Sequence, residues 1–352
     1  MRTFHSQEIR DESQVGAARR GVRRFASPLG FTAEELAEID IVVQEMGTNA
    51  VRYAPGGGRV HWTTTFGPES GLELFYWDKG PGIDDLDRAV RDGVSSGGGL
   101  GAGFGAIQRL SDEFEVYSTV RGTTSRLTGS SRTTHGTSIL CRKWAAKAKA
   151  EAARAGGGEG DLLRRLGAWS RCRSGEHVNG DAYFFRRRGG ETLLAVVDGL
   201  GHGGGARQAA EAAVGALEAW NGEPLDEVIL AAHDALRATR GGVIGAVIVS
   251  PEQERFYYAG VGNIEVRVFG SPVPARPVPS NGTLGLRLSQ VRVWPHQWAE
   301  GTTFVLASDG VSAKWDIESY PGILKRSPQL LAGLLMRDYG RDSDDATALV
   351  AR

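Results

Sequence analysis

Four acidic clusters in the second half of the chain are placed where oxygen ligands are useful. They are centred on Asp181, Asp198, Asp309 and the adjacent pair Asp344 and Asp345. Hard cations such as Mg²⁺ and Mn²⁺ prefer carboxylate, carbonyl and water oxygens. Carboxylates gathered in one place repel one another unless cations lie between them. This half of the sequence therefore predicts a metal-dependent hydrolase.

Two of these acids follow apolar runs that are typical of buried strands. Residues 193–197 lead into Asp198, and residues 304–307 lead through Ser308 to Asp309. Each acid is followed by Gly, which lets the chain turn sharply and leaves the carboxylate at the end of the strand. A single Asp-Gly pair is most often an ordinary turn. The prediction of a metal site therefore depends on the four clusters occurring together.

Three motifs in the first half predict a nucleotide site. Glu45 and Asn49 lie four residues apart near the end of a predicted helix, so they share one face and each can offer an oxygen to a cation. Asp78 begins an Asp-x-Gly-x-Gly turn after a predicted strand. Residues 97–107 form a glycine-rich run that opens a helix, where backbone N–H groups can bind phosphates. Each motif alone is weak, because a solvated helix face, a turn or a plain loop explains it equally well.

The composition is that of a soluble globular protein. The length of 352 residues favours two domains, and 41% hydrophobic with 24% charged residues provides for two cores. A net charge of −1 does not indicate nucleic acid or an anionic membrane as a partner. No apolar run approaches the roughly 20 residues that span a bilayer, and the N-terminus lacks the apolar core of a signal peptide, so we expect a cytoplasmic protein.

Hydrophobic periodicity predicts the order of the elements. Helices are expected at 11–27, 32–54, 205–219 and 224–239. In residues 59–66 the alternation of apolar and polar side chains fits a half-buried strand. Further strands are expected at 72–78, 113–119, 137–142, 181–187, 192–198, 243–249, 255–260, 264–269, 302–308 and 346–351. Residues 144–160 combine helix-favouring Ala, Lys and Glu with a glycine-rich end and are interpreted as a linker.

The order of the three N-terminal motifs resembles the GHKL (Bergerat) ATP-binding fold shared by gyrase, Hsp90, histidine kinases and MutL, over about residues 8–143. The resemblance implies that Asn49 holds Mg²⁺, that Glu45 is the catalytic base and that Asp78 reads the adenine amino group of ATP. It also implies that the nucleotide is bound by Gly80, Gly82, Gly99, Gly101, Gly103, Gly105 and Thr137.

Residues 109–116, Arg-Leu-Ser-Asp-Glu-Phe-Glu-Val, narrow this resemblance to the small RsbT-like serine kinases of bacterial stress-response switches. No phospho-acceptor histidine in a helix hairpin precedes the motifs, which favours these kinases over histidine kinases. The polar segment 119–134 departs from the family because it is longer than the turn expected between the last strands.

The four acidic clusters resemble the PPM family of metal-dependent protein phosphatases, in its SpoIIE/RsbX-like form, from about residue 161 to 352. Gly-Val-Gly-Asn at 260–263 resembles a hairpin segment of the same group. The family places two Mn²⁺ or Mg²⁺ ions in its site, and such a pair, roughly 3.5–4 Å apart, activates water and clamps phosphoryl oxygens. The resemblance implies that Asp198 bridges the metals and is central to catalysis, and that the ligand set is Asp181, Asp198, the Gly199 carbonyl, Asp309 and Asp344. Asp345 stays open as the alternative to Asp344.

Together the resemblances imply an α+β protein with a GHKL ATPase/kinase fold at 1–143, an Ala/Gly-rich linker at 144–160 and a PPM-type β-sandwich flanked by helices at 161–352. The implied function is a bifunctional partner-switching regulator. One half would be an ATP-binding Ser/Thr kinase, and the other a phosphoserine/phosphothreonine phosphatase. The implied partners are STAS-domain antagonists, stressosome-type phosphoproteins and sigma-factor regulators. Two alternatives stay open: an N-terminal half that binds ATP or a partner without phosphotransfer, and a C-terminal half that is an inactive scaffold.

Overall fold

A computed structural model describes residues 2–66, 71–91, 101–120, 134–149, 164–288 and 290–352 of the chain. These residues fall into two compact units. One comprises Arg2–Arg164 and Asp316–Leu330, and the other comprises Arg165–Trp315 and Leu331–Arg352. Gly99, most of the polar segment 119–134 and residues 150–160 of the predicted linker lie outside the described residues.

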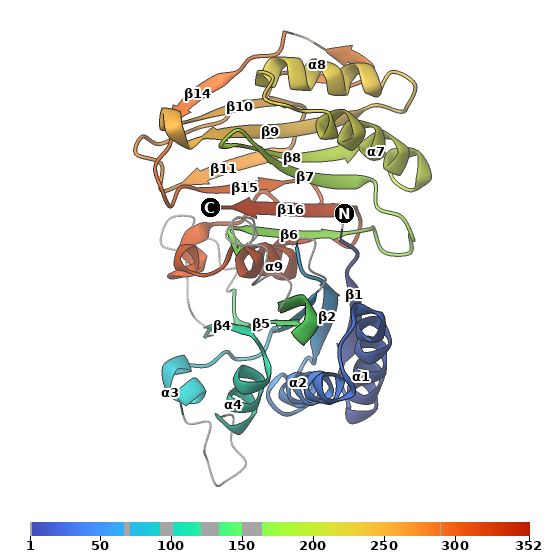
Figure 1. Ribbon diagram of the computed structural model, residues 1–352, viewed down its shortest axis with the longest axis vertical. Helices are drawn as coiled ribbons and strands as arrows, with labels where there is room; N and C mark the ends of the chain where they lie inside the picture. The colour runs from blue at the N-terminus through green and yellow to red at the C-terminus, as the bar shows by residue number, and fades with distance from the viewer. Residues whose placement is uncertain (1, 67–70, 92–100, 121–133, 150–163, 289) are drawn as a thin grey trace. The chain divides into compact units, whose positions relative to one another are not determined.

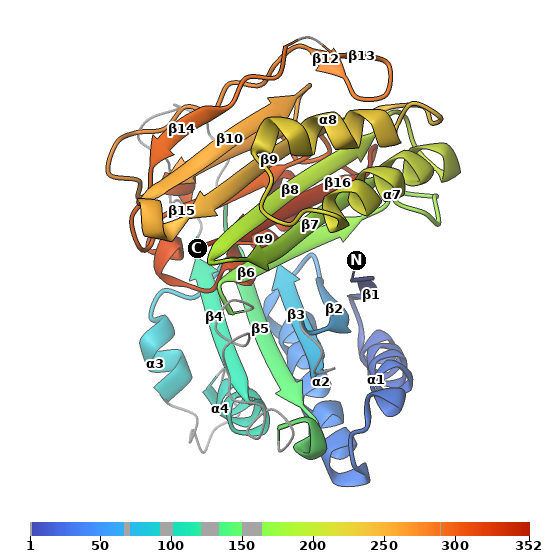
Figure 2. The ribbon, with the colours of Figure 1, turned by 45° about the horizontal axis from the view of Figure 1, so that its top comes forward.

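The N-terminal unit is built on a five-stranded antiparallel sheet with strand order β1-β2-β3-β5-β4 (Figures 1 and 2). Helices α1, α2 and α4 share one hydrophobic core with this sheet. The strands are β1 (His5–Ile9), β2 (Gly58–Thr64), β3 (Gly71–Asp78), β4 (Glu113–Thr119) and β5 (Gly136–Trp144). The helices are α1 (Glu12–Ala26), α2 (Ala33–Tyr53), α3 (Leu86–Arg91) and α4 (Gly101–Leu110).

The two long helices of this unit begin at capping boxes. The Asp11 side chain accepts hydrogen bonds from the backbone N–H groups of Ser13 and Gln14. The Gln14 side chain in turn accepts a hydrogen bond from the Asp11 backbone N–H. At the start of α2, the Thr32 hydroxyl accepts a hydrogen bond from the Glu35 N–H, and the Glu35 carboxylate accepts one from the Thr32 N–H. These reciprocal bonds satisfy backbone N–H groups that have no partner inside the helix. The N-terminal ends of both helices are thereby fixed, and with them the position of the Glu45 and Asn49 face near the end of α2.

Strand β2 is more deeply buried than its alternating pattern predicts. Trp62 faces the core, but His61 and Thr63 on the opposite face are buried as well. His61 packs against the ring of Trp77 on β3, with 4.2 Å between ring centroids. The half-buried prediction was wrong because packing by neighbouring rings, which periodicity does not report, covers the second face.

The C-terminal unit contains two antiparallel sheets that pack against each other, with β16 beside β7 and β8. Helices α7 (Gly204–Glu218) and α8 (Leu225–Ala235) cover the outer face of the larger sheet, with which they share a core (Figure 2). Its strand order is β14-β10-β9-β8-β7, from β7 (Asp181–Arg188), β8 (Glu191–Gly199), β9 (Gly242–Ser250), β10 (Arg255–Val261) and β14 (Trp294–Gln297). The order of the other sheet is β11-β15-β16-β6, from β6 (Leu166–Arg171), β11 (Glu265–Phe269), β15 (Thr303–Ala307) and β16 (Ala346–Ala351).

Smaller elements complete the described chain. A short hairpin pairs β12 (Gly282–Thr283) with β13 (Arg287–Leu288), and α9 spans Pro328–Tyr339. The α+β fold expected from the sequence is confirmed, including the four long helices and the sandwich of two sheets. The sequence did not predict the remaining elements, which are β1, α3, β6, β12, β13, β14 and α9.

Candidate functional site

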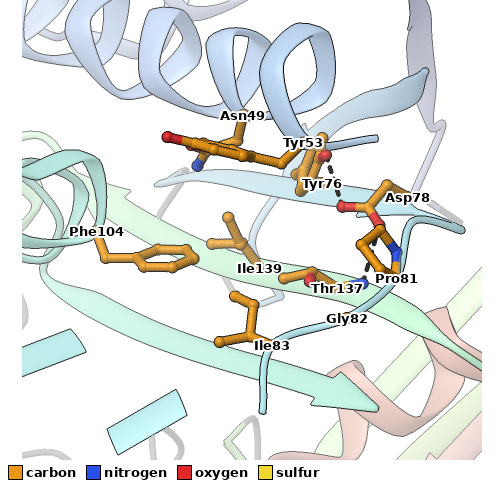
Figure 3. A pocket seen from close by; sticks show the side chains of 10 residues that line it. All are labelled: Asn49, Tyr53, Tyr76, Asp78, Pro81, Gly82, Ile83, Phe104, Thr137 and Ile139. Carbon is orange, nitrogen blue, oxygen red and sulfur yellow. Dashed lines mark hydrogen bonds between the residues drawn. The ribbon is translucent and has the colours of Figure 1, made fainter. Parts of the chain in front are cut away.

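The N-terminal unit contains a pocket of about 110 Å³ at the place where the three motifs meet. Asn49 and Tyr53 reach it from α2, Phe104 from α4 and Asp78 from β3 (Figure 3). Apolar and aromatic side chains line most of the pocket, and a few polar groups are placed among them, as is usual for small-molecule sites. Its lining is Asn49, Tyr53, Tyr76, Asp78, Pro81, Gly82, Ile83, Phe104, Thr137 and Ile139.

Both carboxylate oxygens of Asp78 accept hydrogen bonds within the protein. Oδ1 accepts from the backbone N–H groups of Gly80, at 2.8 Å, and Thr137, at 3.1 Å. Oδ2 accepts from the Tyr76 hydroxyl at 2.7 Å. Burial, followed by the Asp78 charge, raises the pKa of Tyr76 well above its ordinary value, so Tyr76 remains a donor. Asp78 is therefore held in one orientation, with Oδ2 free to accept a further bond from a ligand amino group.

Two glycines let the chain close tightly around Asp78. Gly136 has φ +122°, and a Cβ there would lie 2.2 Å from the Asp78 carbonyl oxygen. Gly82 has φ +81°, and a Cβ there would lie 2.1 Å from the Thr119 carbonyl oxygen. No other residue fits these positions without moving the backbone. The glycine at 82 in the Asp-x-Gly-x-Gly turn is therefore required by the packing of this site.

The glycine-rich helix meets the Glu45 and Asn49 face directly. A Cβ on Gly103 of α4 would lie 2.9 Å from Glu45 Oε2 and 3.7 Å from Asn49 Oδ1. Asn49 is 9% exposed, and within the described chain its Nδ2 has no hydrogen-bond partner. A buried amide without a partner costs free energy unless a ligand or water satisfies it. The structure thus brings together two motifs that are more than 50 positions apart in the sequence.

Four other predicted nucleotide-binding residues lie within the described chain, in β5, in α4 and in the turn after Asp78. Gly80 and Thr137 supply the N–H groups that hold Asp78. Gly101 is the first residue of α4, and Gly105 lies one turn further along that helix.

In the C-terminal unit, the register of two neighbouring strands places the first two acidic clusters opposite each other. Asp181 begins β7, Asp198 is the penultimate residue of β8, and the two are direct cross-strand partners. The Gly199 N–H donates to the Gly180 carbonyl at 3.1 Å. A Cβ on Gly199 would lie 2.1 Å from the Ala206 carbonyl oxygen, so only glycine lets α7 pack against this strand end.

Asp181 lies in a buried polar network. Its side chain is almost fully buried, and Oδ2 accepts a 2.6 Å bond from the Ser308 hydroxyl. Its backbone N–H donates to the Asn179 side chain at 2.9 Å. Asn179 in turn donates to the Ser170 hydroxyl at 2.7 Å. The network fixes Asp181 and links β6, β7 and the end of β15.

The two acids of the last cluster have different environments. Asp345 is buried, and its two oxygens accept from the backbone N–H groups of Arg173 and Gly180, both at 2.8 Å. Asp344 is half-buried and accepts from the Asp345 N–H at 3.0 Å. Asp345 therefore holds the loop before Asp181 in place, which leaves Asp344 as the more available oxygen ligand.

Asp309 is oriented by the Gly-Val-Gly-Asn segment. The Asn263 side-chain amide donates to Asp309 Oδ2 at 3.0 Å. The following residue, Gly310, is so close to β16 that a Cβ there would lie 1.8 Å from the Asp345 carbonyl oxygen. The third and fourth acidic clusters are thereby brought side by side.

The carboxylates are close enough to shift one another's titration. Burial, followed by the charges of Asp309, Asp344 and Asp345, raises the pKa of Asp198 to about 7. Burial, followed by the charge of Asp198, raises the pKa of Asp181 well above its ordinary value. Repulsion of this kind is what bound cations relieve, so the donor set suits hard divalent ions.

The side chains nevertheless do not form a finished cage. Across the described residues, no group of three or more His, Cys, Asp or Glu side chains is arranged to hold a metal ion. Mg²⁺ usually keeps several waters and takes one or two carboxylates, so a metal here would be held partly through water.

Two further polar residues of the C-terminal unit have partners of their own. His202 forms a 2.9 Å contact through Nδ1 with Glu176 and is half exposed. Arg171 pairs with Asp342. Sequence reasoning noted the segment that contains Asn263 but not its bond to Asp309, and it missed the supporting groups Tyr76 and Ser308. Tyr76 stands two residues before Asp78 on one strand, so period-2 spacing could have placed it on the same face.

Family models match both halves of the chain. Residues 10–128 match the histidine kinase-like ATPase domain, and residues 188–352 match the stage II sporulation protein E (SpoIIE) family.

Three similar proteins agree with this division. The serine/threonine-protein kinase RsbT of Bacillus subtilis (strain 168) is 36% identical over 110 residues, which cover 31% of this chain and 83% of RsbT. The phosphoserine phosphatase RsbX of the same organism is 27% identical over 150 residues, which cover 42% of this chain and 74% of RsbX. A chain in a solved structure described as "The bacterial stressosome: a modular system that has been adapted to control secondary messenger signaling" is 32% identical, with a TM-score of 0.51, and the match covers 53% of this chain and 98% of that one.

The chain therefore joins two classes of domain, a GHKL ATPase domain and a PPM-type phosphatase domain. It belongs to the RsbT-like family through its N-terminal half, and its C-terminal half is RsbX-like. The N-terminal match supports the use of ATP, and the gathered carboxylates of the C-terminal half suit divalent metal ions. In the part of the chain that the structure describes, no helix has the length and apolar character needed to cross a membrane.

Proposed function

We propose that this protein is a bifunctional partner-switching regulator that adds phosphate with its N-terminal half and removes it with its C-terminal half. The observation that carries the proposal is the presence, on one chain, of a nucleotide pocket with the RsbT-like motifs and a carboxylate cluster with the RsbX-like order. Residues 1–143 would form the kinase domain, 144–160 the linker and 161–352 the phosphatase domain.

In the N-terminal half, Asp78 would accept the adenine amino group through Oδ2, while Tyr76 and the backbone keep its carboxylate in place. Asn49 would hold the Mg²⁺ that accompanies ATP. Glu45, close to the glycine-rich helix, would take the proton from the acceptor hydroxyl. The N-terminal glycines of this helix, with Gly99 before it, would contact the phosphates.

In the C-terminal half, Asp181, Asp198, Asp309, Asp344 and the Gly199 carbonyl would hold two Mn²⁺ or Mg²⁺ ions. When bound, such ions supply Lewis-acid activation of the phosphoryl group and of the attacking water. Asn263 would orient Asp309, and Ser308 would keep Asp181 in place. The hydrogen bonds that engage both oxygens of Asp345 support Asp344 as the ligand.

The proposed substrates are serine or threonine sites on STAS-domain antagonists or stressosome-type proteins, and sigma-factor regulators are further candidate partners. This step rests on the name and activity of RsbT and RsbX and on the stressosome description of the similar structure. If the N-terminal half only binds ATP or a partner, it would transfer no phosphate to such a protein.

The phosphatase proposal is tested with the full-length protein and a phosphoserine peptide, with and without Mn²⁺. We expect Mn²⁺-dependent phosphate release, and a loss of about 10³-fold in kcat for Asp198→Ala, because Asp198 would hold the ions that activate the water and the phosphoryl group. Asp342→Ala is the matched control, since Asp342 is an exposed carboxylate paired with Arg171. Equal rates for the wild type and Asp198→Ala would refute the metal assignment.

A further inference from the structure

A guanidinium group lies beside the strand end that carries Asp198. Arg240 stands in the connection between α8 and β9. Two residues later, Gly242 is the cross-strand partner of Gly199, and the Gly241 carbonyl accepts a 3.0 Å bond from the Leu200 N–H. The backbone around Arg240 is thus tied to the residues that directly follow Asp198.

The Arg240 side chain lies against the glycine loop between Asp198 and α7. A Cβ on Gly205 would lie 2.5 Å from Arg240 Nε and 2.7 Å from Cζ. A Cβ on Gly201 would lie 3.3 Å from Arg240 Nη1. The next residue after Gly205 is Ala206, whose carbonyl packs against Gly199. The guanidinium therefore lies beside Gly201 and Gly205, in the segment that directly follows Asp198 and Gly199.

Within the described chain, Arg240, like Arg173 and Arg341, has no carboxylate partner, whereas other arginines of this unit are paired. Arg171 pairs with Asp342, Arg207 with Glu211 and Arg237 with Asp234. In the described chain, no hydrogen bond or ion pair engages the Arg240 side chain, which is exposed. A planar guanidinium with all its donors available binds a phosphate group through two parallel hydrogen bonds.

The surroundings of Arg240 suit a phosphate carried on a polypeptide. Leu200, whose N–H bonds to Gly241, is 38% exposed, and Leu286 is 62% exposed. A Cβ on Gly241, the residue after Arg240, would lie 3.2 Å from Leu286 Cγ. Leu286 therefore packs against the backbone beside Arg240. Exposed apolar side chains beside a charge are common at protein-binding surfaces.

We propose that Arg240 binds the phosphoryl group of the phosphorylated side chain that the C-terminal half hydrolyses. The inference rests on the proposed phosphatase function and adds to it a substrate-binding residue from the α8–β9 connection. The positive charge of Arg240 would offset the charge of a phosphate dianion that must approach several carboxylates.

The first test measures binding without catalysis. Full-length wild type, Arg240→Ala, Arg240→Lys and Arg237→Ala are titrated with a fluorescent phosphoserine peptide and its unphosphorylated form in EDTA. We expect Arg240→Ala to weaken phosphopeptide binding by about ten-fold or more, with Arg240→Lys in between and Arg237→Ala unchanged. Binding of the unphosphorylated peptide should be the same for all four proteins. Equal phosphopeptide affinity for wild type and Arg240→Ala would overturn the proposal.

The second test measures hydrolysis with Mn²⁺. Arg240→Ala should raise KM about ten-fold for both a phosphoserine peptide and p-nitrophenyl phosphate, with a smaller effect on kcat and an unchanged melting temperature. A KM increase for the peptide alone would overturn the proposal, since Arg240 would then contact the peptide and not the phosphate. A wild type that hydrolyses neither substrate, but whose selective phosphopeptide binding is lost in Arg240→Ala, would refute the phosphatase function and leave phosphate binding by Arg240 intact.

Discussion

The pocket around Asp78, where we propose that ATP binds, and the carboxylate cluster around Asp198 are organised in opposite ways. In the pocket, both oxygens of Asp78 are held by donors from the protein, and aromatic and apolar side chains define the shape. In the cluster, burial, followed by the charges of neighbouring carboxylates, raises the pKa of Asp198 to about 7. The pocket is thus organised by hydrogen bonds and shape, whereas the cluster gathers negative charge that bound cations would offset. Changes to the pocket should act on nucleotide affinity, and changes to the cluster on metal affinity.

Among the substitutions that test this comparison, we expect Asp78→Asn to have the largest effect. The amide keeps one oxygen for the Gly80 and Thr137 N–H groups but turns its NH₂ toward the Tyr76 hydroxyl and the adenine amino group. We expect ATP affinity, measured by calorimetry, to fall about 100-fold or more, because a bond to a charged group is lost and a donor faces a donor. Mn²⁺-dependent hydrolysis of a phosphoserine peptide should be unchanged. Normal ATP binding by the variant would contradict the proposed role of Asp78.

Metal addition should stabilise the C-terminal half through the cluster. Mn²⁺ at about 100 times its Kd should stabilise the folded state by about 2.7 kcal/mol, seen as a higher melting temperature. Asp198→Ala should abolish this response, because the substitution removes a carboxylate that would hold the ions. An equal Mn²⁺-induced increase in both proteins would show that the ions bind elsewhere.

Asn263→Ala should have a smaller effect on the same property. The substitution leaves the carboxylates in place but removes the amide that orients Asp309. Supporting partners of this kind typically contribute about ten-fold or more to metal affinity. Titration of hydrolysis with Mn²⁺ should therefore shift to about ten-fold higher concentration, with near-normal kcat at saturation. A lowered kcat at saturating Mn²⁺, with no shift in the titration, would exclude this orienting role.

Tyr76→Phe should have the smallest effect, and on the nucleotide pocket. The variant loses one hydrogen bond to Asp78 but keeps the ring and the two backbone donors. We expect ATP affinity to fall by a few-fold and the free energy of unfolding by about 1 kcal/mol. A loss as large as that of Asp78→Asn would mean that Tyr76 contacts the nucleotide itself.

The sequence predicts the long helices and central strands well because their signals are local. Capping residues Asp11 and Thr32 and the apolar runs before Asp198 and Asp309 are examples. The sequence does not predict β1 (His5–Ile9), because this segment is polar and forms a strand through its pairing with β2.

The same difference between local and long-range signals applies to the candidate sites. The motif residues can be read from the sequence, but their supporting partners come from distant segments. Thr137 is 59 positions from Asp78, and Asn263 is 46 positions from Asp309. Periodicity carries no information on such pairs, because only tertiary packing brings them together. The same limit applies to Arg240, whose sequence setting gives no sign that it lies beside Gly205.

The central claim is that one chain adds and removes phosphate at two separate sites. It is tested most directly by following the phosphorylation of a cognate STAS-domain protein over time, with ATP, Mg²⁺ and Mn²⁺, in the presence of wild type, Asp198→Ala or Glu45→Ala. The account predicts high and lasting phosphorylation with Asp198→Ala, a lower steady level with wild type, and none with Glu45→Ala. Phosphorylation that is the same with wild type and Asp198→Ala, or that persists with Glu45→Ala, would contradict it.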